Sequence, residues 1–257
     1  MPHSSLPPPP PPPPRAVSPS PYAHATWGLG DAWAALGIFF IVSIVVGLAV
    51  FGASQDAGLD GIWLPLAVGI PPVVQGIYVW YVAGQKGRGI RHDFGFSFEA
   101  RDILLGAALT VAGLMTAGLV GALMLELFDS APEATVAELT EDSADGGGLT
   151  VWIILLAVLT ATVAPVVEEL VFRGLWWSAL EKRGMKPGWI LIVTSLVFAG
   201  VHLELQRTPI LFVLGLALGA GRLATGRIGP AIIAHAMING IGMLFLLIEI
   251  SEPGTLS

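Results

Sequence analysis

Residues 149–180 read LTVWIILLAVLTATVAPVVEELVFRGLWWSAL, an apolar run that includes the adjacent acids Glu168 and Glu169 and the base Arg173. A helix needs about 20 apolar residues to cross the hydrocarbon core of a bilayer. This run exceeds that length, so we expect it to tilt, kink or leave the bilayer at its end. It shows no period-2 alternation, which favours a helix over a strand. The stretch therefore predicts a membrane helix that carries charged groups.

The composition of the whole chain indicates the same environment. Of the 257 residues, 54% are hydrophobic and only 12% are charged, whereas a soluble domain has about 25% charged residues. The 12 Lys and Arg are scattered over loops, so we expect no nucleic-acid partner. The chain has no Cys, which excludes disulfides, thiolate metal sites and a cysteine nucleophile. Membrane lipid is the partner that this composition requires.

Seven apolar segments organise most of the chain. They are residues 32–51, 62–83, 103–128, 149–180, 188–202, 209–223 and 230–250. We predict an all-α, polytopic bundle of about seven transmembrane helices, because helices and closed barrels alone satisfy their backbone in lipid. The fifth and sixth segments are short, which suits helices buried in the bundle or ending at a cavity. Gly215 and Gly219 in the sixth have the spacing that permits close helix contact.

Residues 1–30 differ from the segments that follow. Pro7 to Pro14 form an unbroken proline run, and proline lacks a backbone donor and fixes φ. We predict a disordered, Pro-rich cytoplasmic tail, with a ligand for a proline-recognising partner as the alternative. A signal peptide is not expected, because no basic start precedes an apolar h-region.

The loop charges predict the orientation. Most of the 12 basic residues fall on one side of the predicted bundle: Arg15, Lys86, Arg88, Arg91, Arg101, Lys182, Arg183, Lys186, Arg222 and Arg227. By the positive-inside rule this side is cytoplasmic, as is the N-terminus. The loop at residues 129–145 carries six acids and no base, so we expect it outside. We predict a multi-pass protein of the bacterial plasma membrane.

The acids of the fourth segment have different predicted roles. A charge at the bilayer centre costs roughly 2.5–3.5 kcal/mol on insertion scales and usually marks a function. Glu169 and Arg173 are four residues apart, so they share a helix face and can pair. Glu168 points about 100° away, toward a different environment. We expect Glu169 to be structural and Glu168 to serve as a base, with a purely structural ion pair and an interfacial Glu168 as the alternative.

Two later segments carry further polar side chains at i,i+4 spacing. Phe198 and His202 share one helix face, and His235 and Asn239 share another. A neutral His and an Asn amide are suitable donors toward an oxyanion. The alternatives are a structural His202 at a helix end and an interhelical hydrogen-bond staple, worth about 1 kcal/mol, for the other two. We expect all three sets of polar residues to face one cavity.

In this order, the three motifs resemble the CPBP intramembrane metalloprotease (ABI) family. That family includes type II CAAX prenyl endopeptidases and bacteriocin-processing or immunity proteins. The motifs are Glu168-Glu169-x-x-x-Arg173, Phe198-x-x-x-His202 and His235-x-x-x-Asn239. The resemblance covers about residues 150–245 and implies a CPBP-type catalytic core in residues 149–250, with accessory transmembrane helices in residues 31–148.

The resemblance also implies residue roles. Glu168 would activate a water, and the adjacent ion pair would hold the fourth helix in place. His202 would help to bind the water, and His235 and Asn239 would stabilise the oxyanion. The family name implies a metal, and Glu168, His202 and His235 are the candidate ligands for a divalent ion such as zinc. The same residues can activate water without a metal, and the sequence leaves both readings open.

The function expected from the sequence is an intramembrane endopeptidase. Its site would open to the cytoplasm and accept a peptide or membrane-protein substrate. One alternative is a non-catalytic immunity or scaffold protein that keeps the motifs for helix packing. Another is a proton-coupled transporter, since buried Glu and His also form proton relays. The chain shows no evident internal repeat of the kind common in transporters, which speaks against that last reading.

Overall fold

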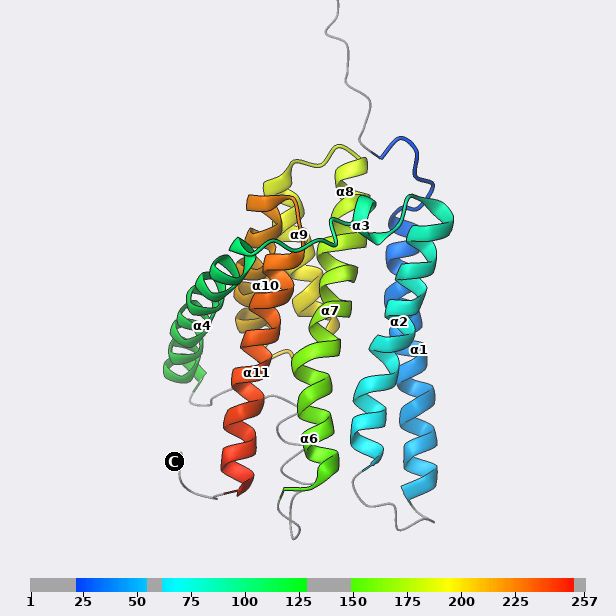
Figure 1. Cartoon of the computed structure of the whole chain (residues 1–257). Coiled ribbons are helices and arrows are strands. Elements are labelled where there is room, and N and C mark those ends of the chain that lie inside the picture. Colours follow the sequence, from blue (N-terminus) through cyan, green and yellow to red (C-terminus); the bar gives the residue numbers. More distant parts are fainter. Residues whose placement is uncertain (1–21, 55–61, 129–148, 252–257) are drawn as a thin grey trace, which may run out of the picture.

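A computed structural model describes residues 22–54, 62–128 and 149–251 (Figure 1). In chain order the helices are α1 (Leu29–Ser54), α2 (Trp63–Lys86), α3 (Ile90–Asp93), α4 (Arg101–Phe128), α6 (Val151–Val158), η1 (Leu159–Val163), α7 (Ala164–Glu169), η2 (Leu170–Trp176), α8 (Trp177–Lys182), α9 (Pro187–Val201), α10 (Thr208–Thr225) and α11 (Gly229–Ser251). Within these ranges the chain forms helices, turns and loops and no strand. The prediction of an all-α bundle is confirmed.

Six helical stretches are long and apolar enough to cross a membrane. They are Leu29–Val50, Trp63–Lys86, Arg101–Leu127, Val151–Lys182, Thr208–Thr225 and Gly229–Ser251. The remaining predicted segment is α9, which is apolar but only 15 residues long. The protein is therefore a multi-pass membrane protein, in which α9 is too short to cross the hydrocarbon core alone.

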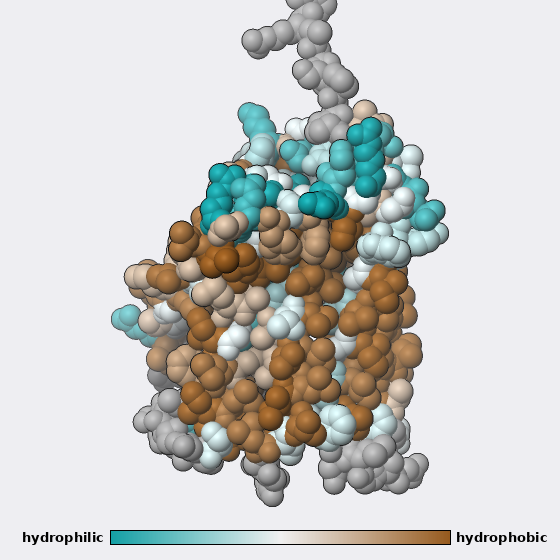
Figure 2. Space-filling model, viewed as in Figure 1, coloured by the Kyte–Doolittle hydropathy of each residue, from teal (hydrophilic) through white to brown (hydrophobic). Residues whose placement is uncertain are grey.

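The surface of the bundle carries a broad apolar region. On the face shown in Figure 2, hydrophobic residues cover the helices, and hydrophilic residues gather at the end that carries α3 and α8. Large apolar side chains are widely exposed along α1 and α4, such as Ile41, Leu104 and Leu119, which are 64%, 77% and 72% exposed. Side chains like these are stable only against lipid, which accounts for the high hydrophobic content of the chain.

The long fourth segment crosses the bundle as one helical rod with two π-helical stretches, η1 and η2 (Figure 1). They flank α7, which carries Glu168 and Glu169. π-turns are uncommon and frequently lie at functional sites. Here η1 ends one helical turn before the two acids and η2 begins directly after them, so the irregular backbone brackets the polar residues.

One end of the bundle joins segments that are distant in sequence. The Lys182 ammonium at the end of α8 donates to the carbonyls of Ala25 and Trp27, at 2.6 and 2.8 Å. Arg222 of α10 donates to the Phe94 carbonyl at 2.8 Å. Trp27 is completely buried, so the chain is packed against the bundle from Tyr22 onward. The prediction of a disordered tail as far as residue 30 is therefore wrong for residues 22–30. The proline run lies outside the described residues.

Asp93 lies at the centre of the hydrogen bonds at this end of the bundle. Its carboxylate is completely buried and accepts from the Trp27 indole at 3.0 Å and from the Arg88 backbone N–H at 2.8 Å. His24 and His92 lie against its other oxygen. Burial raises the pKa of Asp93, but these hydrogen bonds outweigh burial and hold the pKa below its ordinary value. Asp93 therefore links the N-terminal segment, residues 22–28, to the α2–α4 connection.

The basic loops meet at the same end. The α2–α4 connection contacts the α10–α11 turn, where Arg227 pairs with Glu99 at 2.9 Å. Lys182 anchors the N-terminal segment from the α8 side. This convergence agrees with the predicted sidedness, while its cytoplasmic location stays a prediction. The acidic loop at residues 129–145 lies outside the described residues.

The short helices α9 and α10 pack closely through glycine. A Cβ at Gly215 would lie 3.0 Å from the Cβ of Ser195, and one at Gly219 would collide with Leu191. Both contacts are with α9. The predicted packing role of this Gly-x-x-x-Gly pair is confirmed, because only a missing side chain allows the two backbones to approach this closely.

Candidate active site

The predicted ion pair lies at the centre of the bundle. Arg173 Nη1 donates to Glu169 Oε1 at 2.9 Å, and both side chains are completely buried. Arg173 Nη2 donates to the Gly215 carbonyl at 2.7 Å, so the arginine also joins η2 to α10. Its guanidinium lies 4.9 Å from the centroid of the Phe198 ring, a cation–π distance. One arginine thus joins the first motif to the second, through Phe198 of α9, and to α10.

His235 lies between the two acids. Its Nδ1 is 2.9 Å from Glu169 Oε1, and its Nε2 is 3.8 Å from Glu168 Oε2. Glu169 is paired with Arg173 and therefore accepts, so Nδ1 carries the hydrogen of this bond. In the neutral imidazole, Nε2 then presents a lone pair toward Glu168. The hydrogen bond to Glu169 fixes both the tautomer and the orientation of the ring.

The two acids share a neighbour but differ in exposure. The Glu169 side chain is completely buried, whereas that of Glu168 is 24% exposed. The expectation that they face different environments was wrong in one respect, since both reach His235. Consecutive residues of a helix point in different directions, and the imidazole reaches both carboxylates because its two nitrogens also point in different directions. Glu168 Oε2 has no hydrogen-bond partner among the described residues.

His202 caps the C-terminus of α9. Its Nδ1 lies 2.7 Å from the Phe198 carbonyl. A carbonyl only accepts, so Nδ1 is the donor and Nε2 of the neutral ring is an acceptor. The side chain is half-buried. The predicted i,i+4 relation of Phe198 and His202 is therefore real, and it holds the histidine in one tautomer.

Phe198 gathers the site around one ring. Its centroid lies 4.8 Å from that of His202, 5.7 Å from that of His235 and 5.3 Å from that of Phe172, all edge to face. Phe198 itself is only 2% exposed. Because this ring also contacts Arg173, the three motifs lie around a single aromatic side chain and form one site.

Asn239 acts on the backbone of the fourth segment. Its Nδ2 donates to the Thr160 carbonyl at 3.0 Å. The Ala164 N–H binds the Leu159 carbonyl, and Pro165 has no N–H, so neither the α nor the π donor reaches Thr160. Asn239 supplies the missing hydrogen bond. Of the two roles weighed from the sequence, the interhelical staple is the one that this contact supports.

The residues weighed as metal ligands are spread apart. The candidate ligand atoms of Glu168, His202 and His235 do not all lie within 4.8 Å of one another. A tetrahedral zinc site, with bonds of about 2.0–2.2 Å, requires ligand atoms about 3.3 Å apart. The three side chains as arranged therefore do not fit one ion.

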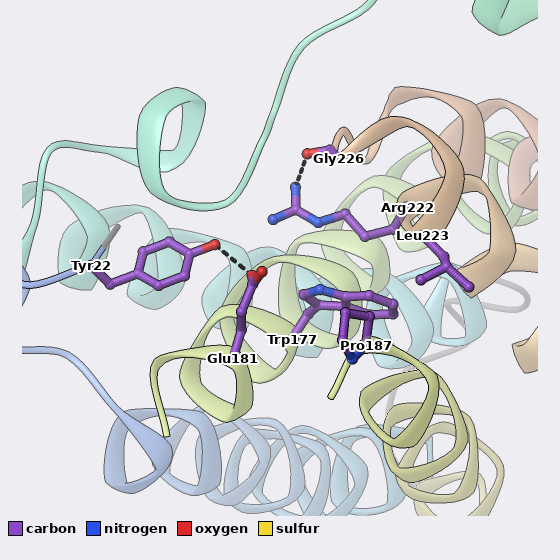
Figure 3. Close-up of a pocket in the computed structure, with 7 residues that line it drawn as sticks. All are labelled: Tyr22, Trp177, Glu181, Pro187, Arg222, Leu223 and Gly226. Carbon is purple, nitrogen blue, oxygen red and sulfur yellow. Dashed lines mark hydrogen bonds between the residues drawn. The ribbon is translucent and has the colours of Figure 1, made fainter. Parts of the chain in front are cut away.

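A pocket of about 220 Å³ lies elsewhere, at the end of the bundle that carries α8. Figure 3 shows the Tyr22 hydroxyl pointing at the Glu181 carboxylate, a hydrogen bond of 2.8 Å, and Arg222 reaching the Gly226 carbonyl. Glu181 is roughly 20 Å from Glu168 along the helix axis. The pocket is therefore separate from the buried acids.

Comparison with known proteins identifies the segment that holds this site. Residues 150–241 match the family model described as "Type II CAAX prenyl endopeptidase Rce1-like". None of the curated proteins and none of the solved structures matches the chain. The family resemblance drawn from the three motifs is confirmed over this segment, which contains every residue named in them.

Proposed function

We propose that the chain is a membrane endopeptidase in which Glu168 activates water, because residues 150–241 match the Rce1-like family model of type II CAAX prenyl endopeptidases. The observation that carries the proposal is the position of His235. Glu169 orients its ring from one side, and its free nitrogen faces the partly exposed Glu168 on the other. An ion pair alone needs neither a second acid nor an oriented imidazole.

The tautomers support a bound water. Glu168 Oε2 and the Nε2 atoms of neutral His202 and His235 are acceptors. A water has two hydrogens, so it satisfies Glu168 and one imidazole together. Its lone pair then points away from both acceptors, toward an incoming carbonyl carbon. The Glu169–Arg173 pair contributes by holding His235 in the required tautomer, without contact with the substrate.

The proposed reaction uses Glu168 twice. Glu168 takes one proton from the water as the water oxygen bonds to the carbonyl carbon, and the carbonyl electron pair moves to its oxygen. When the C–N bond breaks, protonated Glu168 returns the proton to the leaving nitrogen, and the products are a carboxylic acid and an amine. General base catalysis of this kind contributes roughly 10²–10⁴-fold.

The oxyanion donors proposed from the sequence are constrained by this geometry. Neutral His235 has no hydrogen on Nε2, so it stabilises an oxyanion only after it takes up a second proton. Asn239 keeps one amide hydrogen beyond the one donated to Thr160. These two groups remain our proposed donors, with Asn239 aimed by its contact to the π-helical backbone.

We propose peptide segments of membrane proteins as the substrate class. The acids lie within the spanning helix Val151–Lys182, so a substrate must enter from lipid or from a membrane surface. We assign the entrance to the cytoplasmic side, in a multi-pass protein of the bacterial plasma membrane. The charged loops gathered at one end support this orientation. The prenyl group in the family's description is not part of the proposal.

The test compares membranes from cells that lack the protein with membranes from cells that carry only Glu168→Gln. Sequencing of the new peptide N-termini should show the same products missing from both, relative to wild type. Glu126→Gln on α4, where the glutamate is exposed, is the matched control and should restore every product. Wild-type products in the Glu168→Gln membranes would contradict the mechanism and favour a non-catalytic scaffold.

A further inference from the structure

A second polar cluster lies at the loop end of the bundle, outside the acids of α7. The donors are His24 of the N-terminal segment and His92 and Asp93 of α3. Their ligand atoms all lie within 4.8 Å of one another. His24 Nε2 is 2.8 Å and His92 Nδ1 is 3.2 Å from the same oxygen, Asp93 Oδ1. Three side chains from two distant segments thus converge on one point.

We propose that His24, His92 and Asp93 bind a divalent transition-metal ion, Zn²⁺ by the chemistry of the donors. Two imidazoles and one carboxylate form a three-residue zinc set that leaves a fourth position for water. Ligand atoms around zinc lie about 3.3 Å apart. His24 Nε2, now 2.8 Å from Asp93 Oδ1, would therefore move away from it by roughly half an ångström, and the two histidine nitrogens, which lie within 4.8 Å of each other, would reach the same spacing. Side chains on two separate segments accommodate this change.

The surroundings of the carboxylate support binding. The second oxygen, Asp93 Oδ2, accepts from Trp27 Nε1 at 3.0 Å and from the Arg88 N–H at 2.8 Å. Ligating carboxylates are commonly held by such outer hydrogen bonds, which orient the other oxygen toward the ion. Asp93 is completely buried, while the His92 side chain is 54% exposed. An ion therefore has a path from solvent to an anchored, buried oxygen.

The nearby cations do not block the site. The Arg88 guanidinium lies 3.5 Å from His92 Nε2, on the side of the ring away from Asp93. Arg88 is exposed and can turn into solvent. Its contribution to Asp93 comes from its backbone N–H, which a substitution of the side chain leaves in place. The two histidine rings meet edge to face at 5.5 Å, so they do not stack in a way that an ion would have to disrupt.

Metal binding here would fasten the N-terminal segment to the bundle. His24 lies in the same segment as Ala25 and Trp27, whose carbonyls bind Lys182 at the end of α8. An ion shared by His24 and α3 would attach this segment to α3 as well as to α8. Because the ion binds the folded state, it would also raise stability with its concentration.

The test is zinc titration of the full-length, metal-free protein in detergent, by calorimetry, with any affinity tag removed. We expect one equivalent to bind and the affinity to fall at least tenfold in both His24→Gln and His92→Gln. Arg88→Gln should bind as tightly as wild type or more tightly. His202→Gln should also bind one equivalent, which separates this site from the acids of α7.

Cobalt provides a second readout that does not depend on heat. Co²⁺ in the wild type should give the visible absorption of a four-coordinate site, and His92→Gln should lose it. His92 is half exposed, so that variant is the one expected to fold without difficulty, which far-UV circular dichroism checks. Unchanged binding in both His24→Gln and His92→Gln, binding lost in His202→Gln alone, or a wild type that takes up no ion would each overturn the proposal.

Discussion

Removal of both partners of the buried ion pair should destabilise the protein by less than the sum of the two single removals. Arg173→Met leaves Glu169 charged in a completely buried position, where loss of one partner costs about 3–5 kcal/mol. The same change also removes the Arg173 hydrogen bond to the Gly215 carbonyl, and a hydrogen bond from a charged donor contributes about 1.5–3 kcal/mol. Even about 3 kcal/mol is roughly a hundredfold change in the unfolding equilibrium, at 1.4 kcal/mol per tenfold.

The double variant Glu169→Gln/Arg173→Met isolates the pair. Glutamine can still accept from His235, and no buried charge is left without a partner. We expect the double loss to be smaller than the sum of the single losses by about 2 kcal/mol, within the usual range for coupled neighbours. Arg173→Lys should lose an intermediate amount, because one ammonium cannot reproduce the fork that joins Glu169 to Gly215.

The assay is reversible unfolding in detergent micelles, followed by circular dichroism over a denaturant series for the wild type and each variant. A matched slope for all variants shows that the free energies of unfolding are comparable. Additive losses, with a coupling below about 0.5 kcal/mol, would refute the view that this pair is a single buried unit. Single losses under about 1 kcal/mol would refute the burial itself.

Two further predictions use the same unfolding measurement, and a third uses thermal melting over a series of pH values. Asn239→Leu should lose about 1 kcal/mol, because a carbonyl in the π-helical stretch loses its donor; no loss would contradict the staple. Gly219→Leu should lose about 1–3 kcal/mol by collision with Leu191, whereas Gly118→Leu, where an added Cβ would meet no atom within 4 Å, should lose nothing. Burial raises the pKa of Tyr22 above 10.0. The contribution of its neutral hydroxyl to the free energy of unfolding is therefore full below the unfolded pKa and is lost as pH rises through the folded pKa. The melting temperature of the wild type should fall at alkaline pH, and that of Tyr22→Phe should fall less.

The sequence predicts the helices well because lipid leaves few alternatives. Long apolar runs must be helical in a bilayer, so all seven predicted segments form helices. The Glu169–Arg173 pair was also predictable, since i,i+4 spacing on a helix brings the two side chains together. What spacing cannot give is the angle between helices, and that angle places His235 of α11 against both acids.

The N-terminal segment shows the limit of composition as a guide. Its proline-rich start suggested a tail as far as residue 30, but Tyr22 and Trp27 are buried. Aromatic residues just after the prolines were the available signal. For the cluster at Asp93 the sequence carried only a weak signal, the adjacent His92 and Asp93 in a loop. Nothing local in the sequence indicates that His24 meets them across 69 residues.

The histidine and the asparagine of α11 act on the same helix in different ways. Pro165 removes a backbone donor three residues before Glu168, and the backbone widens into η1 rather than breaking. Each residue of a helix turns the chain by about 100°, so one residue more or fewer in η1 would rotate both acids away from α11. Asn239 binds the carbonyl that this widening frees, and His235 binds the acids that the widening aims. Two residues one turn apart on α11 therefore hold both the irregular turn of the fourth segment and its carboxylates.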